Sequence, residues 1–262
     1  MSQKLPYTTR LGTGLGLVDE TMALLDLWEP ELLNDEFYSK ALESGRFPNI
    51  SARRLKNIIR ECFAPRYLCN NGIPALTLKK LADQIPLREL LQFMFLFTSR
   101  ANSILYDFVC QIYWPAYASG RDALSNHEAR LFLEGAIAAG QTTGRWSEKV
   151  TKNVAGYLTG CCSDFGLLEN GHKQVRRFNQ FTLNFKAAAF LSYDLHFSGI
   201  GDNAVTAHHD WELFGLEKED VRDVLKRLSL KGFFIIQTAG SVTHIGWKYK
   251  TWEDLIHVIA ES

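Results

Sequence analysis

Residues 51–63 read SARRLKNIIRECF, a stretch with the periodicity of a short helix whose two faces differ in chemistry. Its apolar residues recur at the spacing i, i+3, i+4 and i+7, which places them on one helical face. These residues are Leu55, Ile58, Ile59 and Cys62. Ser51 precedes them, and its hydroxyl can accept a hydrogen bond from a backbone N–H of the first turn. The pattern predicts a helix that is capped at Ser51 and anchored to a core by its apolar face.

The opposite face of this helix is basic and polar. The residues of this face and its edge are Arg53, Arg54, Lys56, Asn57, Arg60 and Arg66. Guanidinium, ammonium and amide groups bind the phosphates and the base edges of nucleic acids, so the face has the chemistry of a DNA-contacting surface. An ordinary solvated helix face has a similar composition, and the pattern alone does not separate the two interpretations.

The composition is that of an ordinary globular protein with a substantial core. The chain has 262 residues, of which 46% are hydrophobic and 22% are charged, and its formal net charge is zero. A neutral molecule is not drawn as a whole to an acidic surface. Any affinity for nucleic acid must therefore come from local basic patches, and it should decrease as salt increases.

A second basic patch lies between residues 145 and 186. Lys149 and Lys152 are expected on one helix, opposite its apolar stripe, and Arg176 and Arg177 follow in the next segment. Together with the first patch they would extend a set of phosphate contacts, provided that the fold brings the two patches together. From residue 187 onward the balance reverses, with eleven acidic residues and seven basic ones.

The cysteines and the apolar segments indicate a protein of the reducing cytoplasm. The five cysteines include an adjacent pair, Cys161 and Cys162, and no CxxC motif, which argues against a disulfide framework or a zinc site. The N-terminus has no apolar run of signal-peptide length. The longest apolar run, residues 90–97, is too short to span a bilayer, so no membrane association is expected.

Helical periodicity dominates the chain up to residue 199. Gly140 and Gly144 flank a small polar segment that we take as the best internal boundary. The sequence thus predicts an N-terminal helical domain of residues 1–142, which carries the basic helix, and a C-terminal domain of residues 143–262. Helices are expected near residues 17–28, 31–43, 51–63, 77–82, 87–97, 101–117, 125–139, 147–165 and 183–197.

The last part of the chain predicts a helix followed by a β-hairpin and a final capped helix. The helix covers residues 217–231, the hairpin strands cover 233–237 and 242–247, and the final helix begins after Thr251. A helix followed by a hairpin is typical of the tail of a winged-helix module. The helix begins with acidic residues that repel DNA phosphates, so we interpret this part as a protein-contact surface.

No constellation of residues indicates catalysis. The sequence has no GxSxG motif, and no cysteine has an evident histidine partner. His208, His209 and Asp210 resemble metal ligands, but they are sequence neighbours, and a polar loop in which Asp210 caps the next helix explains them better. We therefore expect a protein that is not an enzyme and that needs no cofactor, no metal and no small-molecule ligand.

Four stretches of the chain resemble the BrxA family, accessory proteins of the BREX (bacteriophage exclusion) systems. They are residues 11–28 (LGTGLGLVDETMALLDLW), 53–62 (RRLKNIIREC), 145–168 (RWSEKVTKNVAGYLTGCCSDFGLL) and the tail 210–256. The resemblance covers nearly the whole chain with correct order and spacing, although its motifs are diffuse and include no catalytic signature. Some members have been labelled inner-membrane proteins, a label that the lack of a spanning segment argues against.

The resemblance implies a mainly α-helical, non-enzymatic protein that is encoded with a BREX methyltransferase, an ATPase and a phosphatase-like protein. It also implies affinity for double-stranded DNA and a helical part similar to the antitermination protein NusB. The leading hypothesis is therefore a DNA-binding accessory protein of phage defence, with other BREX components as further partners. The main alternative is an adaptor that holds defence components together through the winged tail. RNA binding is a third possibility, which no RNA-recognition motif supports.

Overall fold

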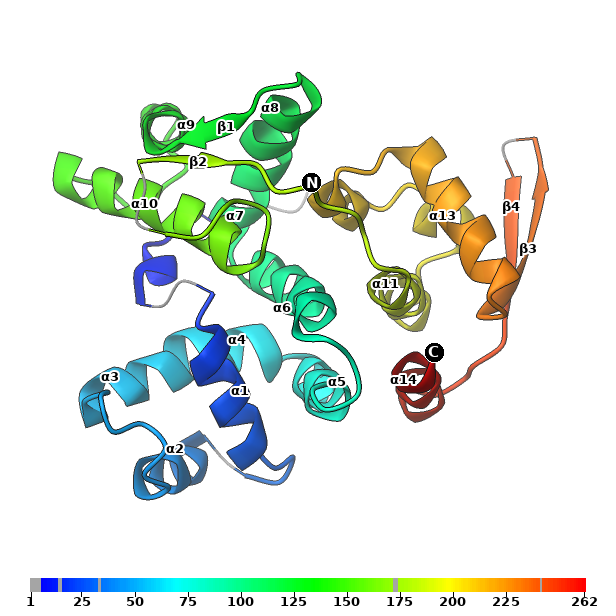
Figure 1. Cartoon of the computed structure of the whole chain (residues 1–262), viewed down its shortest axis with the longest axis horizontal. Helices are drawn as coiled ribbons and strands as arrows, with labels where there is room; N and C mark the ends of the chain where they lie inside the picture. Colours follow the sequence, from blue (N-terminus) through cyan, green and yellow to red (C-terminus); the bar gives the residue numbers. More distant parts are fainter. Residues whose placement is uncertain (1–5, 14–15, 33, 172–173, 241) are drawn as a thin grey trace. The chain divides into compact units, whose positions relative to one another are not determined.

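The computed structural model describes residues 6–262 except 14–15, 33, 172–173 and 241. Across these residues the chain is mainly helical and has two small two-stranded antiparallel sheets (Figure 1). The expected mainly α class is confirmed. In the part of the chain described here, no helix combines the length and the apolar character that crossing a bilayer requires.

The chain divides into two compact units that each draw on two segments. The first unit contains residues 1–79 and 94–181, and the second contains residues 80–93 and 182–262. The expected boundary at 142/143 lies inside the first unit. There the Tyr7 N–H donates to the Gln141 carbonyl at 2.7 Å, and the Thr143 N–H donates to the Tyr7 carbonyl at 3.0 Å. These backbone bonds hold the glycine-flanked segment against the start of the chain, so it does not behave as a linker.

The first unit is helical apart from one short sheet. Its helical elements before residue 82 are η1 (Arg10–Thr13), α1 (Val18–Leu27), α2 (Asn34–Glu43), α3 (Ala52–Asn57), η2 (Ile58–Phe63), α4 (Ala64–Tyr67), η3 (Asn70–Gly72) and α5 (Ile73–Leu81). The later elements are α6 (Leu87–Ala101), which begins in the second unit, α7 (Ser103–Phe108), η4 (Val109–Tyr113), α8 (Trp114–Ala118), β1 (Ala123–Ser125), α9 (Asn126–Ala138), α10 (Glu148–Asp164) and β2 (Val175–Arg177).

Two of the helical stretches contain π-helical turns that the sequence analysis did not predict. η2 joins α3 to α4, and η4 joins α7 to α8, so each set forms one helical run with a widened middle. Both widened turns end just before a proline-containing turn, at Pro65 and at Pro115. Proline lacks an N–H, and its ring clashes with the carbonyl four residues earlier in an α-helix. The π-helical turn relieves that clash.

An aromatic cluster holds the centre of the first unit. The ring of Phe63 lies 5.4 Å from the rings of both Phe37 and Tyr67, measured between centroids, and Tyr67 meets Phe97 edge to face at 6.4 Å. All four side chains are buried. Edge-to-face and tilted pairs add to the stabilisation that burial alone provides. The cluster therefore fixes the helical run of α3, η2 and α4 from its inner side.

Helices α9 and α10 pack against each other beside the sheet formed by β1 and β2. The two strands pair with Leu124 opposite Arg176. α9 begins with a capping box, in which the Ser125 hydroxyl accepts from the Glu128 N–H and the Glu128 carboxylate accepts from the Ser125 N–H. Ser147 caps α10 by accepting from the Val150 N–H, and Gly166 follows its end with a positive φ of 79°.

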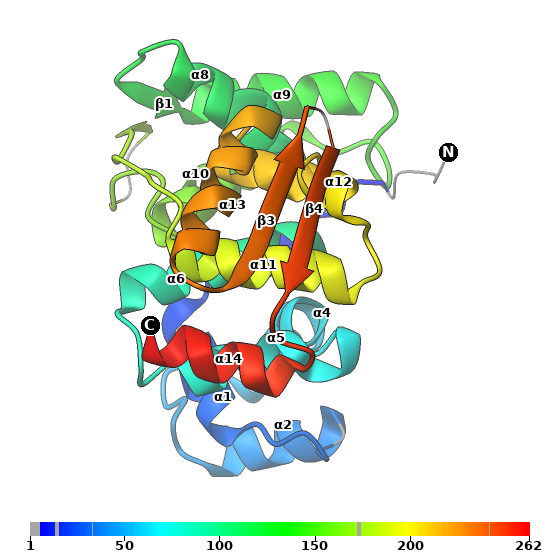
Figure 2. The same ribbon diagram turned by 90° about the vertical axis from the view of Figure 1, so that its right-hand side faces the viewer.

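The second unit is built around α11, a helix that is buried on nearly every side. Its described elements after residue 182 are α11 (Phe185–Phe197), α12 (Asp202–Val205), η5 (His209–Phe214), α13 (Lys218–Leu230), β3 (Phe234–Ala239), β4 (Val242–Trp247) and α14 (Trp252–Glu261). The expected hairpin is present, with Phe234 opposite Trp247, and Figure 2 shows α13 beside β3. Asp202 holds β4 in place, because its carboxylate accepts from the Ile245 N–H at 2.8 Å and the Trp247 Nε1–H at 3.0 Å.

We expect the capping box of α9 to make stability depend on pH. The hydrogen bond from Arg121, together with those from Ser125, lowers the pKa of Glu128 to about 2. The stabilisation is complete above the unfolded-state pKa of about 4.3 and is lost as the pH falls towards the folded-state value. Glu128→Gln should lower the unfolding free energy by about 1 kcal/mol at pH 7. The difference in unfolding free energy between the wild type and Glu128→Gln, measured by denaturant titration, should become smaller below pH ~4. A deficit of the same size at every pH would contradict the role given to this carboxylate.

Candidate nucleic-acid interface

The helical run that begins at Ser51 has the two faces that the sequence predicts. The Ser51 hydroxyl accepts from the Arg54 N–H at 3.3 Å, so the predicted cap is present. The residues of the apolar stripe are each no more than 1% exposed, and they anchor the run to the core: Leu55, Ile58, Ile59 and Cys62. Burial of this kind stabilises a helix far more than its intrinsic propensity does.

The exposed side of the run carries four of the expected contact residues at its surface: Arg53, Arg54, Asn57 and Arg60. Lys56 is half-buried, and its ammonium lies 5.4 Å from the centre of the Tyr38 ring on α2. That position gives the lysine a cation–π contact. Arg60 forms an ion pair of 2.5 Å with Asp35, also on α2. Both partners are exposed, so the pair contributes little and can exchange for another anion.

Arg53 and Arg54 are the cations of this surface that are most available to a ligand. Within the described part of the chain, neither forms an ion pair or a side-chain hydrogen bond. The nearby Glu61 pairs with Arg10 of η1 at 3.1 Å, so that carboxylate is already partly neutralised. The local field is therefore positive at the start of α3 and closer to neutral at η2, where Asp35 faces Arg60.

Arg66 does not border the exposed face, which corrects the expectation from the sequence. Its side chain is 2% exposed, and its Nη1 donates to the Gly16 carbonyl at 3.5 Å. A π-helical turn holds more residues than an α-helical turn, so the angular positions beyond Ile58 depart from the spacing that the sequence analysis assumed. Arg66 thus lies inside the unit, where it binds the segment that leads into α1.

The second patch is split between the surface and the interior. Lys149 and Lys152 are exposed on α10, opposite a stripe that buries Val154 and Leu158. Arg177 is exposed on β2, but its neighbour Arg176 is only 8% exposed. Successive side chains of a strand point to opposite faces, which explains why two adjacent arginines separate in this way. Of the residues expected to extend the phosphate contacts, Arg176 is therefore buried and does not lie on the exposed surface with the other three.

The two basic segments are linked through η1. This short helix contacts α10 on one side and η2 on the other, and Figure 1 shows it between them. Both patches therefore belong to the first unit, with η1 and its Arg10–Glu61 ion pair separating them. Phosphate contacts at both patches would require a ligand that extends past η1, as a DNA backbone does.

A polar cavity of about 910 Å³ lies between α9, α10 and residues 170–171 and 174–176. Two of the expected contact residues, Lys152 and Arg176, line it together with Asn126, Arg130, Asn153 and Gln174. Sequence reasoning did not find this cavity, because it forms where the pairing of β1 with β2 brings distant segments together. The one local signal is the spacing of Gly156 and Gly160 on α10. These two glycines leave a short part of one helix face without side chains.

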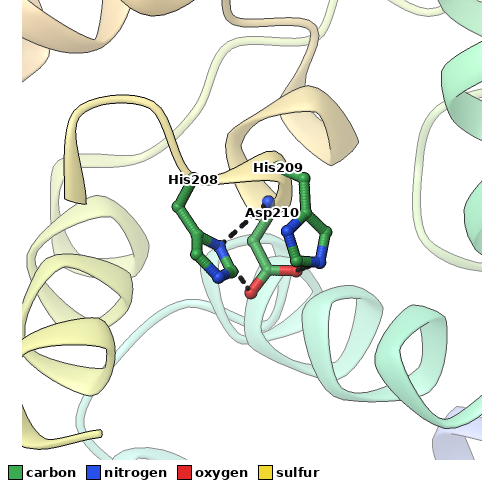
Figure 3. Close-up of side chains that lie close together, drawn as sticks. All are labelled: His208, His209 and Asp210. Carbon is green, nitrogen blue, oxygen red and sulfur yellow. Dashed lines mark hydrogen bonds and ion pairs between the residues drawn. The ribbon is translucent and has the colours of Figure 1, made fainter. Parts of the chain in front are cut away.

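His208, His209 and Asp210 lie close together at the start of η5 (Figure 3). The Asp210 carboxylate is 3.5 Å from His208 Nδ1 and 3.8 Å from His209 Nε2. The helix cap is His208 rather than Asp210, because His208 Nδ1 accepts from the Asp210 N–H at 3.2 Å. His208 therefore caps η5 through its ring nitrogen.

Comparison with known proteins places the chain in a family. No match was found among curated proteins. A crystal structure of an uncharacterized protein from Magnetospirillum magneticum has a similar fold, with a TM-score of 0.59 and 14% sequence identity. The similarity covers 73% of this chain and 95% of the other. The family model of BrxA matches residues 5–193, which is more than half of the sequence, and the chain therefore belongs to the BrxA family.

Proposed function

We propose that this protein is a DNA-binding accessory component of a BREX phage-exclusion system and contacts double-stranded DNA mainly through phosphates. The observation that carries the proposal is the anchored α3–η2 run, whose exposed face presents Arg53 and Arg54 without ion-pair partners among the described residues. Membership of the BrxA family supports the association with BREX. We further propose that the protein has no enzymatic activity and works with other BREX components.

The proposed contact follows from charge and position. Arginine binds phosphate through two parallel N–H donors. Here the arginines project from a helix whose other face is buried in the core. Arg60 would exchange Asp35 for a phosphate at little cost, since that pair is exposed. Lys149, Lys152 and Arg177 would extend the contact beyond η1. Because the contacts are to the backbone, sequence specificity is expected to be modest.

Reversing the charge of Arg53 and Arg54 tests this surface. The double variant Arg53→Glu, Arg54→Glu should bind a 20-base-pair random duplex at least about tenfold more weakly at low salt. The slope of log K against log salt should flatten by roughly one unit for each lost phosphate contact. Fluorescence anisotropy across a salt titration measures both quantities.

The matched control for that test is Lys248→Glu, Lys250→Glu, which makes the same change in net charge at two exposed residues of the second unit. This control should retain the wild-type slope. If both double variants lose affinity equally, the effect comes from net charge and the α3 surface is not the site. Unchanged binding by the Arg53, Arg54 variant, with a wild-type melting temperature, would also contradict the proposal.

The second candidate function is an adaptor that binds another protein through the second unit. On α13 and the hairpin of this unit, three large apolar side chains are exposed: Leu230 on α13 at 88%, Ile235 on β3 at 67% and Val242 on β4 at 56%. Apolar side chains that are exposed together on neighbouring elements are typical of surfaces that contact another protein. We propose for this part a winged-helix-like arrangement that serves protein contact, and for the helical part a similarity to NusB.

The adaptor candidate predicts that Ile235→Lys removes co-purification of other BREX components from nuclease-treated lysate while duplex binding stays at the wild-type level. The lysine side chain would project from an already exposed position and should leave the fold intact. Leu131→Lys, an equivalent change at an exposed leucine of α9, is the control and should retain the partners. Loss of partners in both variants, or in neither, would contradict a contact through the hairpin.

A further inference from the structure

We propose that the cavity between α9, α10 and residues 170–171 and 174–176 binds a nucleoside phosphate. The nucleotide would be either free or an unpaired terminal nucleotide of DNA. This site goes beyond the proposed duplex contact, because it would accept a free nucleotide whether or not the α3 surface docks on DNA. It also departs from the expectation, drawn from the sequence, that the protein takes no small-molecule ligand.

The strongest indication is the buried guanidinium of Arg176. The side chain is 8% exposed and lines the cavity. Its Nη1 donates to the Ser163 hydroxyl and to the Glu169 carbonyl, both at 3.2 Å, while its Nε has no hydrogen-bond partner among the residues that the structure describes. Among the described residues it forms no ion pair. Asp164, which also lines the cavity, is an acid that interacts with this guanidinium through space, and burial raises the pKa of that acid. An anion in the cavity would add to the neutralisation of the buried guanidinium and occupy its remaining donor.

Among the described residues that line the cavity, three cations (Arg130, Lys152 and Arg176) face two carboxylates (Glu148 and Asp164). Lys152 forms no ion pair within the described residues, whereas Arg130 is engaged by Glu134 at 2.9 Å and lies 4.0 Å from Glu148. Glu148 and Asp164 are the acidic residues among those that line the cavity. The Asp164 carboxylate accepts from the Gly16 N–H at 2.8 Å, and burial raises the pKa of this group. Lys152 and Arg176 are thus the cations that a phosphate would bind.

The remaining lining suits a base and a sugar better than a bare phosphate. Four amide side chains line the cavity, and amides both donate to and accept from the edges of bases: Asn126, Asn153, Asn170 and Gln174. The ring of Tyr157 also borders the space and offers a surface on which a base can stack. The cavity volume of about 910 Å³ is in the usual range for ligand sites and is far larger than the volume of inorganic phosphate.

Gly156 allows the site to be blocked without a change in charge. It lies on α10 at the cavity, and a Cβ at this position would meet no atom within 4 Å. A leucine here would therefore enter the open space, and it has a higher helix propensity than glycine. Gly135 on α9 offers the matched control, since it is exposed, has the same open surroundings and does not line the cavity.

The test measures binding of deoxynucleoside monophosphates and of inorganic phosphate to the full chain by isothermal titration calorimetry. The wild type should bind at least one nucleotide, and inorganic phosphate about tenfold or more weakly. Gly156→Leu should lose about tenfold or more of the nucleotide affinity, as should Lys152→Gln, while Gly135→Leu should match the wild type. No nucleotide binding, equal binding of inorganic phosphate, or an unaffected Gly156→Leu protein would overturn the proposal.

Two further arms separate this site from the duplex surface and identify the source of the nucleotide. The Arg53→Glu, Arg54→Glu protein should bind the nucleotide as the wild type does, and Gly156→Leu should bind a blunt duplex normally. Loss of nucleotide binding in the Arg53, Arg54 variant would overturn a separate site. A duplex with one unpaired terminal nucleotide that binds more tightly than a blunt one, with the gain removed by Gly156→Leu, identifies DNA as the source. Equal binding of the two duplexes identifies the free nucleotide.

Discussion

The burial of one helix face determines what the opposite face can do. Leu55, Ile58, Ile59 and Cys62 are almost completely removed from water, and the aromatic cluster around Phe63 holds them from the inner side. Because the apolar face cannot turn outward without exposing this surface, the arginines of the other face have a fixed direction. A helix backbone that is fixed in this way loses little further freedom when the helix binds a rigid, charged ligand such as duplex DNA, and the ordering cost is confined to the arginine side chains.

The sequence predicts those features that depend on local chemistry. The caps at Ser51 and Thr251, the apolar stripes and the hairpin of the second unit all follow from patterns within a few residues of one another. The π-helical turn before Pro65 was not predicted, since an i+3, i+4 pattern assumes a uniform helix. The burial of Arg66 follows from that turn. Local patterns predict where helices and strands form. A departure from regular helix geometry, here the π-helical turn, determines which cations reach the surface.

The cavity could not be predicted, because no local pattern encodes it. It depends on the pairing of β1 with β2, which lie about fifty residues apart in sequence, and on a helix face left open by Gly156 and Gly160. The same pairing turns Arg176 inward while Arg177 stays outside. The neutral chain thus holds cations in two environments, on an open surface and in the lining of a cavity.

The central claim is that a protein with no net charge binds duplex DNA through a local basic surface. It is tested most directly by measuring the affinity of the wild-type protein for a random-sequence duplex, with a matched RNA duplex in parallel, from low to physiological salt. The account predicts tight binding to the DNA duplex at low salt and a steep linear fall of log K with log salt. Absence of binding at low salt, or a clear preference for the RNA, would contradict it.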